Sequence, residues 1–429
     1  MGYLAQYDNA PDDATRVRLV QTWIRSQDWA PFFQELREHR PVLVTPAFTL
    51  VSRFSDVVEV LSHETVFTAR LYARSMDPAL DGPFMLSRDA TPVNWREKGI
   101  MRAVLRPEDL PWVRDLAGAL ADEALDRHEC AGRLDAVHDL GRYVPVRMCG
   151  EYFGFPGPDL ATMYRWSRAA QVDMFKNLQA VPALHEASVV AGHELIDYLR
   201  SVLHEKRAEL DKGVEDPPQD TFSRLVRTEF PAELGFDDRR ILANIAGLLV
   251  GAVETTSQAV VQVLHQILLR PETLRAATAA AEGDPPGFDP YVWEALRFNP
   301  INPLVFRVCE QPYTVAAGTP RATAIPAGTM VFALTASAMF DELAVADPHT
   351  FRIDRPDHNT LHFGFGHHTC LGQHVAGAMV PEVVRRVLLR APRLLPAPAD
   401  GIDFAGGPFP ERFALAFGGA APGEELLPA

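Results

Sequence analysis

The sequence predicts a mostly helical protein that also carries small β-sheets. Two long stretches, about 93–127 and 135–210, have helical character, and an apolar stretch runs from 241 to 269. Shorter apolar runs bounded by turn residues indicate strands before and after this helical part, within 41–51 and 312–334. Long helices need a shared apolar core, and 47% hydrophobic residues supply enough material for one.

The N-terminal part is expected to alternate short elements with loops. Residues 41–44 and 48–51 are predicted to pair as a small hairpin, and residues 56–61 to form a helix after it. Residues 69–92 contain Gly, Pro and Met with little periodicity, so a covering loop is expected there. The helical stretch that follows is expected to break near Pro107, because proline lacks the backbone N–H.

Proline and glycine divide the rest of the chain. Breaks are expected at 155–158, and a polar connector at 212–220, which contains two adjacent prolines. Strands are predicted at 312–315 and 329–334. The last helix contains Pro381, where we expect a kink or a break.

Charge and cysteine content narrow the class of protein. Residues 1–25 carry charges throughout and no apolar core, so this N-terminal extension is predicted to be neither a signal peptide nor a membrane anchor. Polar residues interrupt the stretch 241–269, which argues against a membrane span. A net charge of −15 argues against nucleic acid as a partner, and four scattered cysteines indicate a reducing, cytoplasmic compartment.

The most informative segment is the run FGFGHHTCLG, which begins at Phe363. Gly366 and Gly372 permit tight turns around Cys370, so the segment is predicted to be a loop that presents one thiolate to a haem iron. Phe363 is suited to cover the sulfur side of a flat cofactor, and His368 to reach an anionic group on its edge.

Two other interpretations compete with haem ligation. A lone cysteine is usually a small buried hydrophobe. Zinc is the second, because four metal-ligand side chains crowd together here: His367, His368, Cys370 and His374. The glycines and phenylalanines match a close-approach loop better than a compact tetrahedral knuckle, and no second ligand pair follows nearby.

The pattern Phe363-x-x-Gly366-x-x-x-Cys370-x-Gly372 resembles the cysteine-ligand loop of the cytochrome P450 family, the haem-thiolate monooxygenases. The resemblance implies a mostly α fold with small β-sheets, in which one triangular-prism-like domain spans 1–429 and ends in a tail at 419–429. It also implies haem b between two central helices, with Cys370 as the axial thiolate ligand of the iron.

A second match lies in the helical segment that contains Glu294 and Arg297. These residues share one helix face among apolar neighbours and resemble the family's structural Glu-x-x-Arg pair. The third partner of that pair is expected to be Arg355 or His358. A similar segment, 410–413, lies beyond the cysteine and therefore in the wrong order.

Basic residues resemble those that pair with the haem propionates. Arg307 matches by position, and a guanidinium suits this role because its planar fork binds carboxylates bidentately. Lys98, Arg102 and Arg106 recur every four residues and share one helix face, so Lys98 or Arg102 is expected to meet a propionate. The alternative is a basic surface for a redox partner, which would also include Arg385, Arg386 and Arg390.

The apolar stretch resembles the family's oxygen-activation segment at Gly251, Ala252, Glu254 and Thr255. A threonine hydroxyl near glycine can bond to a helix carbonyl and open the helix locally. The resemblance makes Glu254 and Thr255 an acid–alcohol pair that delivers protons, with the acid connected to solvent. Ala252 stands where the family has a second glycine.

Substrate contacts follow from family position alone and are predicted to line a largely apolar pocket. The predicted contacts are Leu71, Phe84, Met85, Gly247, Gly251, Leu304, Val305 and Phe409. Met174 and Phe175 are expected to add adaptability, and Arg70, Arg74 and Asp77 to meet a polar end of the molecule.

The resemblance implies a monomeric monooxygenase that uses O2 to hydroxylate or otherwise oxidise a mainly apolar small molecule of secondary metabolism. Its electrons are expected from a separate ferredoxin and ferredoxin reductase, because no flavin or iron–sulfur segment is fused to the chain. Oxidative coupling, desaturation or peroxide-driven oxidation by the same haem-thiolate is the alternative, and a non-catalytic haem sensor is a remote one.

Overall fold

The computed structural model describes residues 1–128, 131–212, 219–356, 358, 360–390 and 401–416, which form two compact units. The first unit comprises Met1–Pro78, Gly82–Gly99 and Asn302–Leu371. The second comprises Ala79–Asp81, Ile100–Ile301 and Gly372–Ala429. The predicted connector at 212–220 and the predicted tail fall largely or wholly outside the described residues.

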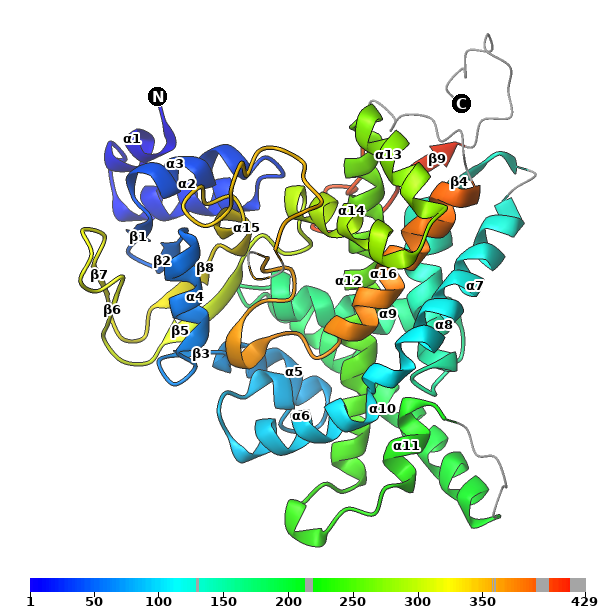
Figure 1. Ribbon diagram of the computed structural model, residues 1–429. Helices are drawn as coiled ribbons and strands as arrows, with labels where there is room; N and C mark the ends of the chain where they lie inside the picture. Colours follow the sequence, from blue (N-terminus) through cyan, green and yellow to red (C-terminus); the bar gives the residue numbers. More distant parts are fainter. Residues whose placement is uncertain (129–130, 213–218, 357, 359, 391–400, 417–429) are drawn as a thin grey trace. The chain divides into compact units, whose positions relative to one another are not determined.

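The first unit is built from short helices and the largest sheet (Figure 1). Its N-terminal helices are α1 (Tyr3–Asp8), α2 (Asp13–Arg25), α3 (Ala30–His39), α4 (Phe54–Ser62) and α5 (Ala73–Ala79), whose last residue belongs to the second unit. Shorter turns are η1 (Arg70–Tyr72), η2 (Met85–Ser87), α15 (Thr335–Ala338) and η9 (Gly366–His368). The expected loop at 69–92 therefore contains three short helical elements, and the extension at 1–25 is helical.

Five strands form this sheet in the order β1-β2-β8-β5-β3. They are β1 (Val42–Val44), β2 (Phe48–Val51), β3 (Phe67–Thr68), β5 (Val305–Cys309) and β8 (Met330–Ala333). The predicted hairpin is confirmed, with Val42 opposite Val51, and β2 continues parallel to β8, with Phe48 opposite Met330. A separate antiparallel pair joins β6 (Tyr313–Val315) to β7 (Thr323–Ile325). Strands β5 and β7 were not predicted from sequence.

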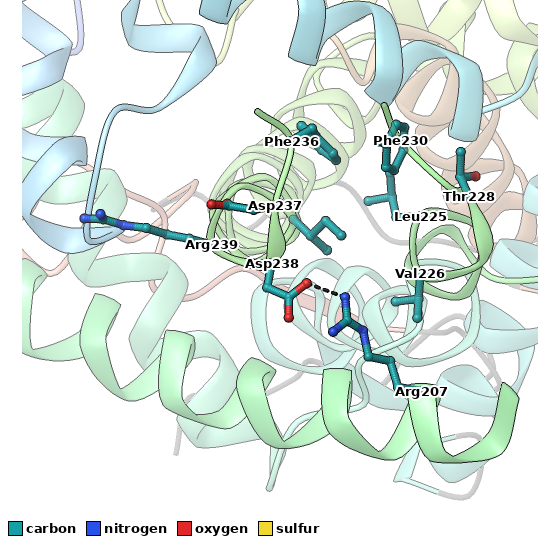
Figure 2. A pocket seen from close by; sticks show the side chains of 10 residues that line it. Arg207, Leu225, Val226, Thr228, Phe230, Phe236, Asp237, Asp238 and Arg239 are labelled. Atoms are coloured by element: carbon teal, nitrogen blue, oxygen red, sulfur yellow. Dashed lines mark hydrogen bonds and ion pairs between the residues drawn. The ribbon is translucent and has the colours of Figure 1, made fainter. Parts of the chain in front are cut away.

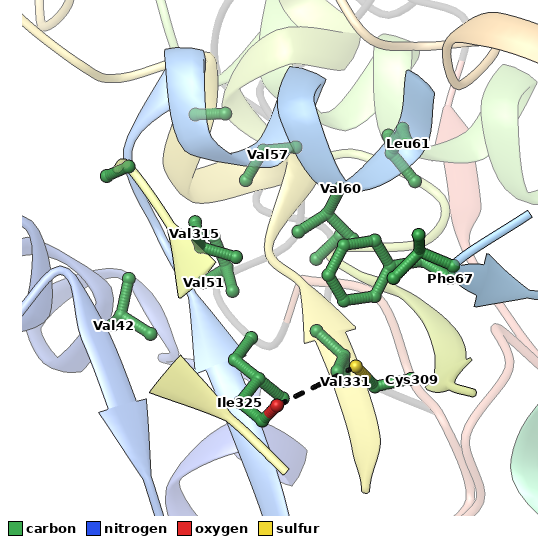
Figure 3. Packing of buried hydrophobic residues seen from close by; sticks show 14 of the residues in the cluster. Val42, Val51, Val57, Val60, Leu61, Phe67, Cys309, Val315, Ile325 and Val331 are labelled. Carbon is green, nitrogen blue, oxygen red and sulfur yellow. Dashed lines mark hydrogen bonds between the residues drawn. The ribbon is translucent and has the colours of Figure 1, made fainter. Parts of the chain in front are cut away.

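One apolar cluster holds α4 with this sheet (Figure 3). Val57, Val60 and Leu61 are spaced along one face of α4 and are buried with Phe67 and Val331 from the strands. Side chains at i, i+3 and i+4 meet on one helix face, which explains why this segment is helical and docks in a fixed orientation. The core therefore fixes the position of Leu61, whose carbonyl lies against the cysteine loop.

The second unit is almost entirely helical. Its helices are η3 (Pro107–Asp109), α7 (Leu110–His128), η5 (Ala136–Arg142), α8 (Tyr143–Glu151), α9 (Leu160–Gln171), η6 (Val172–Lys176), α10 (Pro182–Asp211), α11 (Thr221–Arg227), η7 (Ala232–Leu234), α12 (Asp238–Leu268), α13 (Pro271–Ala281), α14 (Pro285–Phe298) and α16 (Gln373–Arg390). Strands β4 (Arg133–Asp135) and β9 (Ala414–Ala416) pair antiparallel. Helix α6 (Pro92–Val104) starts in the first unit and ends in the second.

Helix α12 is the central helix of the second unit. It packs against α8, α9, α10, α14 and α16, and most of its side chains are buried. By length and composition α12 could cross a membrane, but its most apolar window is 78% buried among these helices, as in a core helix. Of the kink or break predicted at Pro381, a break is wrong, because α16 runs unbroken through this residue.

Candidate functional site

The cysteine loop holds its sulfur outward on a tightly folded backbone. The Cys370 side chain is an exposed thiol, and its backbone N–H donates to the carbonyl oxygen of Phe363 at 2.9 Å. Gly364 and Gly366 have φ angles of 73° and 70°, which favour glycine. A Cβ on Gly366 would lie 2.5 Å from the carbonyl oxygen of Leu61, so no other residue fits there without a shift.

Lys98 is buried against this loop, whereas Arg102 is exposed. The Lys98 ammonium donates to the carbonyl oxygens of His367 and Thr369, the residues on either side of His368. Within the first unit, Lys98 therefore contacts the backbone of the cysteine loop on both sides of His368. Burial also removes Lys98 from any surface that receives a redox partner.

Arg307, which is buried, and His368, which is partly buried, are two further basic side chains of the first unit. His368 Nε2 lies 2.9 Å from Asp89 Oδ1, and Asp89 also accepts a hydrogen bond from the backbone of Ala69 at 2.8 Å. Burial lowers the pKa of His368, and the positive charge of Arg307 lowers it further, although Asp89 opposes both effects. Arg307 donates to the carbonyl oxygen of Phe306 at 2.9 Å. The sequence did not identify Asp89 as the partner of His368.

Along α12, a stripe of small residues is less buried than the rest of the helix. Gly247, Ala252 and Thr255 are partly exposed and Gly251 is exposed, on a helix whose other middle residues are mostly buried. The Thr255 hydroxyl donates to the carbonyl oxygen of Gly251, which confirms the predicted diversion of that hydroxyl. The helix itself stays continuous, and a Cβ on Gly251 would meet nothing within 4 Å.

Glu254 lies on the buried side of the same helix. Its side chain is 0% exposed, so any connection between this acid and solvent must run through other side chains. One carboxylate oxygen, Oε2, accepts from Arg168 Nε at 3.0 Å, while Oε1 has no hydrogen-bond partner among the described residues. Burial raises the pKa of Glu254, although the charges of Arg168 and Arg142 act in the opposite direction.

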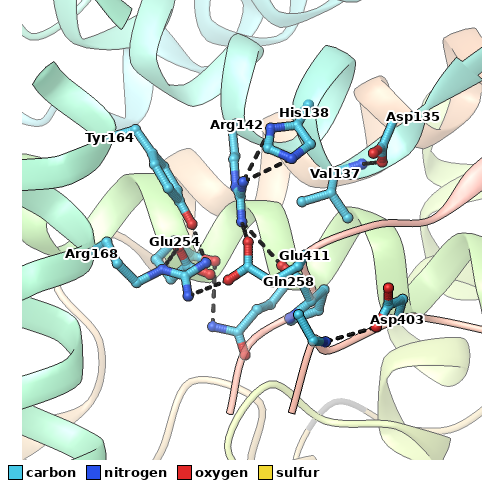
Figure 4. A network of polar contacts seen from close by, with 12 residues as sticks. Asp135, Val137, His138, Arg142, Tyr164, Arg168, Glu254, Gln258, Asp403 and Glu411 are labelled. Carbon is cyan, nitrogen blue, oxygen red and sulfur yellow. Dashed lines mark hydrogen bonds and ion pairs between the residues drawn. The ribbon is translucent and has the colours of Figure 1, made fainter. Parts of the chain in front are cut away.

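Ion pairs continue from Glu254 to the protein surface (Figure 4). Arg168 Nη1 donates to Glu411 Oε1 at 2.7 Å, and Arg142 Nη2 donates to Glu411 Oε2 at 2.6 Å. The Arg168 side chain also donates to the hydroxyl of Tyr164. We call these five residues the Glu254 cluster: Arg142, Tyr164, Arg168, Glu254 and Glu411. Because Glu411 is partly exposed, the cluster joins the buried acid to solvent through two intervening ion pairs.

Most members of the Glu254 cluster were not predicted from the sequence. Arg168 and Glu411 lie 86 and 243 residues from their partners, Glu254 and Arg168 respectively, so local spacing carries no sign of either contact. The only sign of the Glu254 cluster in the sequence was segment 410–413, which contains Glu411. This segment was discounted because it lies in the wrong order for the Glu-x-x-Arg network.

The predicted Glu294–Arg297 pair is confirmed as a buried contact. Arg297 Nε and Nη2 donate to the two carboxylate oxygens of Glu294, each at 2.8 Å. Arg355, one expected third partner, donates to the carbonyl oxygens of Ala346, Asp347 and Thr350. The other expected partner, His358, is exposed.

The predicted substrate residues fall into two groups by exposure. Leu71, Gly247, Leu304 and Val305 are partly exposed and Gly251 is exposed, whereas Phe84, Met85 and Phe409 are buried. Phe409 has the guanidinium of Arg168 4.5 Å from its ring centroid and the ammonium of Lys176 5.4 Å away. Two of the residues expected to meet a polar end of the substrate already form ion pairs within the protein. Arg70 pairs with Glu310, and Asp77 pairs with Arg88.

Three of the six residues expected to form a basic surface are paired with acids. Arg386 and Arg390 pair with Asp122 and Asp126, and Arg385 pairs with Glu382. Of its other predicted members, Lys98 is buried, whereas Arg102 and Arg106 are exposed. The zinc interpretation finds no support either, because no group of three or more His, Cys, Asp or Glu side chains within the described ranges could hold a metal ion.

The second unit contains a cavity of about 480 Å³ (Figure 2). Phe230, Phe236 and Leu225 line its apolar part, and the ion pair of Arg207 with Asp238 lines its polar part. None of the sequence-predicted catalytic or cofactor residues contributes to it, so we assign it no role.

Comparisons with known proteins agree with the predicted family. The family profile described as Cytochrome P450 matches residues 159–282 and 286–391. The chain is 28% identical to cyclomarin C epoxidase CymV of Salinispora arenicola over 93% of this chain and 96% of that protein. It is 26% identical to the steroid C26-monooxygenase of Mycolicibacterium smegmatis over 86% of this chain and 87% of that one.

Solved structures show the same fold. The ligand-free structure of cytochrome P450 TbtJ1 superposes with a TM-score of 0.76 at 23% identity, covering 91% of this chain and 97% of that one. This confirms the mostly helical fold with small sheets that the sequence predicted. The chain belongs to the cytochrome P450 family and is a P450 monooxygenase.

Proposed function

We propose that Cys370 is the axial thiolate ligand of haem b and that this enzyme oxidises a mainly apolar small molecule of secondary metabolism. The observation that carries the proposal is an exposed cysteine thiol on a loop whose glycines let backbone segments approach closely. When bound, thiolate-ligated haem supplies the activation of O2 that the protein alone cannot perform.

Three basic side chains of the first unit suit the two carboxylates of haem. Lys98 and Arg307 are buried and carry fixed charge, and His368 is held in orientation by Asp89. Charged donors bind carboxylates more strongly than neutral donors do, and Arg307 can bind one bidentately. We propose Lys98 rather than Arg102 for this role, because Arg102 is exposed to solvent.

Thr255 and Glu254 are proposed to supply protons for oxygen activation. The Thr255 hydroxyl lies on the less buried stripe of α12 and is held by the carbonyl oxygen of Gly251. A hydroxyl so placed can donate its own proton while it accepts another. Glu254 is the proton source behind it, and the Glu254 cluster connects that source to the surface.

The substrate is proposed to be mid-sized and mainly apolar, with one polar end. Two observations support this class: predicted pocket residues such as Leu304 and Val305 are apolar, and the relatives named above are an epoxidase of cyclomarin C and a steroid monooxygenase. The enzyme is proposed to be monomeric and cytoplasmic. It is proposed to receive its electrons from a separate ferredoxin and ferredoxin reductase.

A ligand screen tests this proposal. Mid-sized apolar compounds with one polar end should displace the water on the haem iron and produce a low-spin to high-spin shift. Compounds that shift the spectrum are then incubated with a ferredoxin, its reductase and O2, and oxygenated product is expected. If only small, highly charged molecules produced the shift, the proposed substrate class would be wrong.

A further inference from the structure

Lys176 is a cation without an ionic partner among the described residues of the second unit. It ends η6, the short segment between α9 and α10 that also carries Met174 and Phe175, and its side chain is partly buried. Its ammonium lies 5.4 Å from the centroid of Phe409, a residue predicted to contact substrate. No hydrogen bond or salt bridge of its side chain is found in the described part of the chain.

The nearest acids are committed to other partners. Asp173, on the same short segment, bonds to His185 and to Asn177. Glu254 is the charged group that acts on Lys176 through space, and its paired oxygen is held by Arg168. Burial lowers the pKa of Lys176, which is the expected effect on a cation that lacks a counter-ion.

The ion pairs of this region do not include Lys176. Arg168 and Arg142 pair with Glu254 and Glu411, and Asp173 is bound by His185 and Asn177, so no ion pair of Lys176 is found among the described residues. Phe409 provides an apolar surface that two of these cations already contact. A partly buried, unpaired cation beside an aromatic ring suits a ligand with an apolar body and one anionic end.

We propose that Lys176 binds a carboxylate at the polar end of the substrate, beside Phe409. This inference rests on the proposed function, because it names the polar end that the proposed substrate class requires. It also replaces the earlier expectation that Arg70, Arg74 and Asp77 provide that contact.

A matched pair of ligands tests the assignment, with dodecanoate compared with dodecanamide. Their chains are identical, so the ratio of their affinities reports recognition of the carboxylate. A hydrogen bond between two charged groups is worth a factor of about 10 or more, so the holoenzyme should bind dodecanoate at least ~10-fold more tightly. Affinities are measured by calorimetry and by the spin-state shift.

Variants of the protein test whether Lys176 causes the preference for the carboxylate. Lys176→Met, which keeps the length of the side chain and removes its charge, should bring the affinity ratio close to one. Lys176→Arg should retain most of the preference, and Lys212→Met, at an exposed lysine beyond the end of α10, should leave it unchanged. Equal binding of acid and amide by the unmodified enzyme, an unchanged ratio in Lys176→Met, or no binding of the acid would each overturn the assignment.

The haem spectrum separates this failure from failure of the proposed function. Each variant is first tested for the thiolate-ligated spectrum of its reduced, carbonyl-bound form. A normal spectrum with no preference for the acid rejects the role of Lys176 alone, whereas a missing thiolate spectrum in the unmodified protein rejects the proposed function itself.

Discussion

The cysteine loop and the Glu254 cluster are built by different means. The loop depends on local backbone geometry: glycines with positive φ, a hydrogen bond from Cys370 to Phe363, and one close approach to Leu61. The Glu254 cluster depends on charged side chains from η5, α9, α12 and the segment before β9. A local device leaves a pattern in the sequence, whereas a long-range ion-pair network leaves almost none.

Replacing Arg168 should cause the largest loss of stability, because Arg168 forms ion pairs with both acids of the Glu254 cluster. Arg168→Met would leave Glu254 buried without its cation, and breaking a buried pair costs roughly 3 kcal/mol or more of the free energy of unfolding. Chemical denaturation measures this loss. The double variant Arg168→Met with Glu254→Gln should recover a large part of it, because no unpaired charge remains.

Arg165 provides a matched control on the same helix. Its pair with Glu194 is about half exposed, so Arg165→Met should cost no more than ~0.5 kcal/mol. Equal losses in Arg165→Met and Arg168→Met would contradict the claim that burial of the Glu254 cluster makes its ion pairs important.

Gly366→Ala tests the local geometry of the cysteine loop. Alanine at this position would have a strained, positive φ, and its Cβ would lie 2.5 Å from the carbonyl oxygen of Leu61. We therefore expect the free energy of unfolding to fall by about 2 kcal/mol and haem to be retained less well. Gly377→Ala is the control, because a Cβ there meets nothing within 4 Å inside α16. That change should stabilise the protein by roughly 0.5 kcal/mol, as alanine favours helix more than glycine does.

The pH dependence of stability tests the burial of Glu254. Its raised pKa means that the folded protein holds the proton at pH values where the unfolded chain has released it. Below the ordinary value of 4.5 the carboxyl is neutral in both states, and above it the unfolded state is increasingly favoured. Denaturation at several pH values should therefore show the parent protein losing stability relative to Glu254→Gln as pH rises above 4.5.

Glu194 should show the opposite pH dependence of stability. Its hydrogen bond from Trp166 and its contact with Arg165 lower the pKa of this carboxyl, so the stability it contributes is present at neutral pH. That contribution is lost as pH falls below 4.5. A difference between the parent protein and Glu254→Gln that did not change with pH would contradict the raised pKa.

Thr255→Ala is expected to alter catalysis with the smallest effect on stability. The hydroxyl is partly exposed and bonds only to a helix carbonyl, so the free energy of unfolding should change by less than about 1 kcal/mol. Reducing equivalents should instead appear as hydrogen peroxide, because the proton donor is missing. The ratio of product formed to reduced nicotinamide consumed measures this coupling, and Thr256→Ala, at a buried neighbour, should leave it largely intact.

Local chemistry explains which features could be predicted from the sequence. Short apolar runs bounded by turn residues predicted the β1–β2 hairpin, and the glycine pattern predicted the loop around Cys370. The hydroxyl of Thr255 bonds to a residue one helical turn away, so its partner was also predictable. Each of these contacts joins residues that are close together in the chain.

The missed features join residues that are distant in sequence. Strand β5 was not recognised because its burial comes from pairing with β8 and β3. Arg168 and Glu411 look like ordinary surface charges until α9 and the segment before β9 meet at Glu254. Lys98 and Arg102 occupy the same helix face, and only tertiary burial distinguishes them.

The central claim is that Cys370 supplies the thiolate ligand of haem, and the absorption spectrum of the reduced, carbonyl-bound protein tests it most directly. The parent protein should show a Soret band strongly shifted to longer wavelength than that of histidine-ligated haem. Cys370→Ala should lose this band, and Cys309→Ala, at a buried cysteine of the same unit, should retain it. A shifted Soret band that survived in Cys370→Ala, or its absence from the parent protein, would contradict the claim.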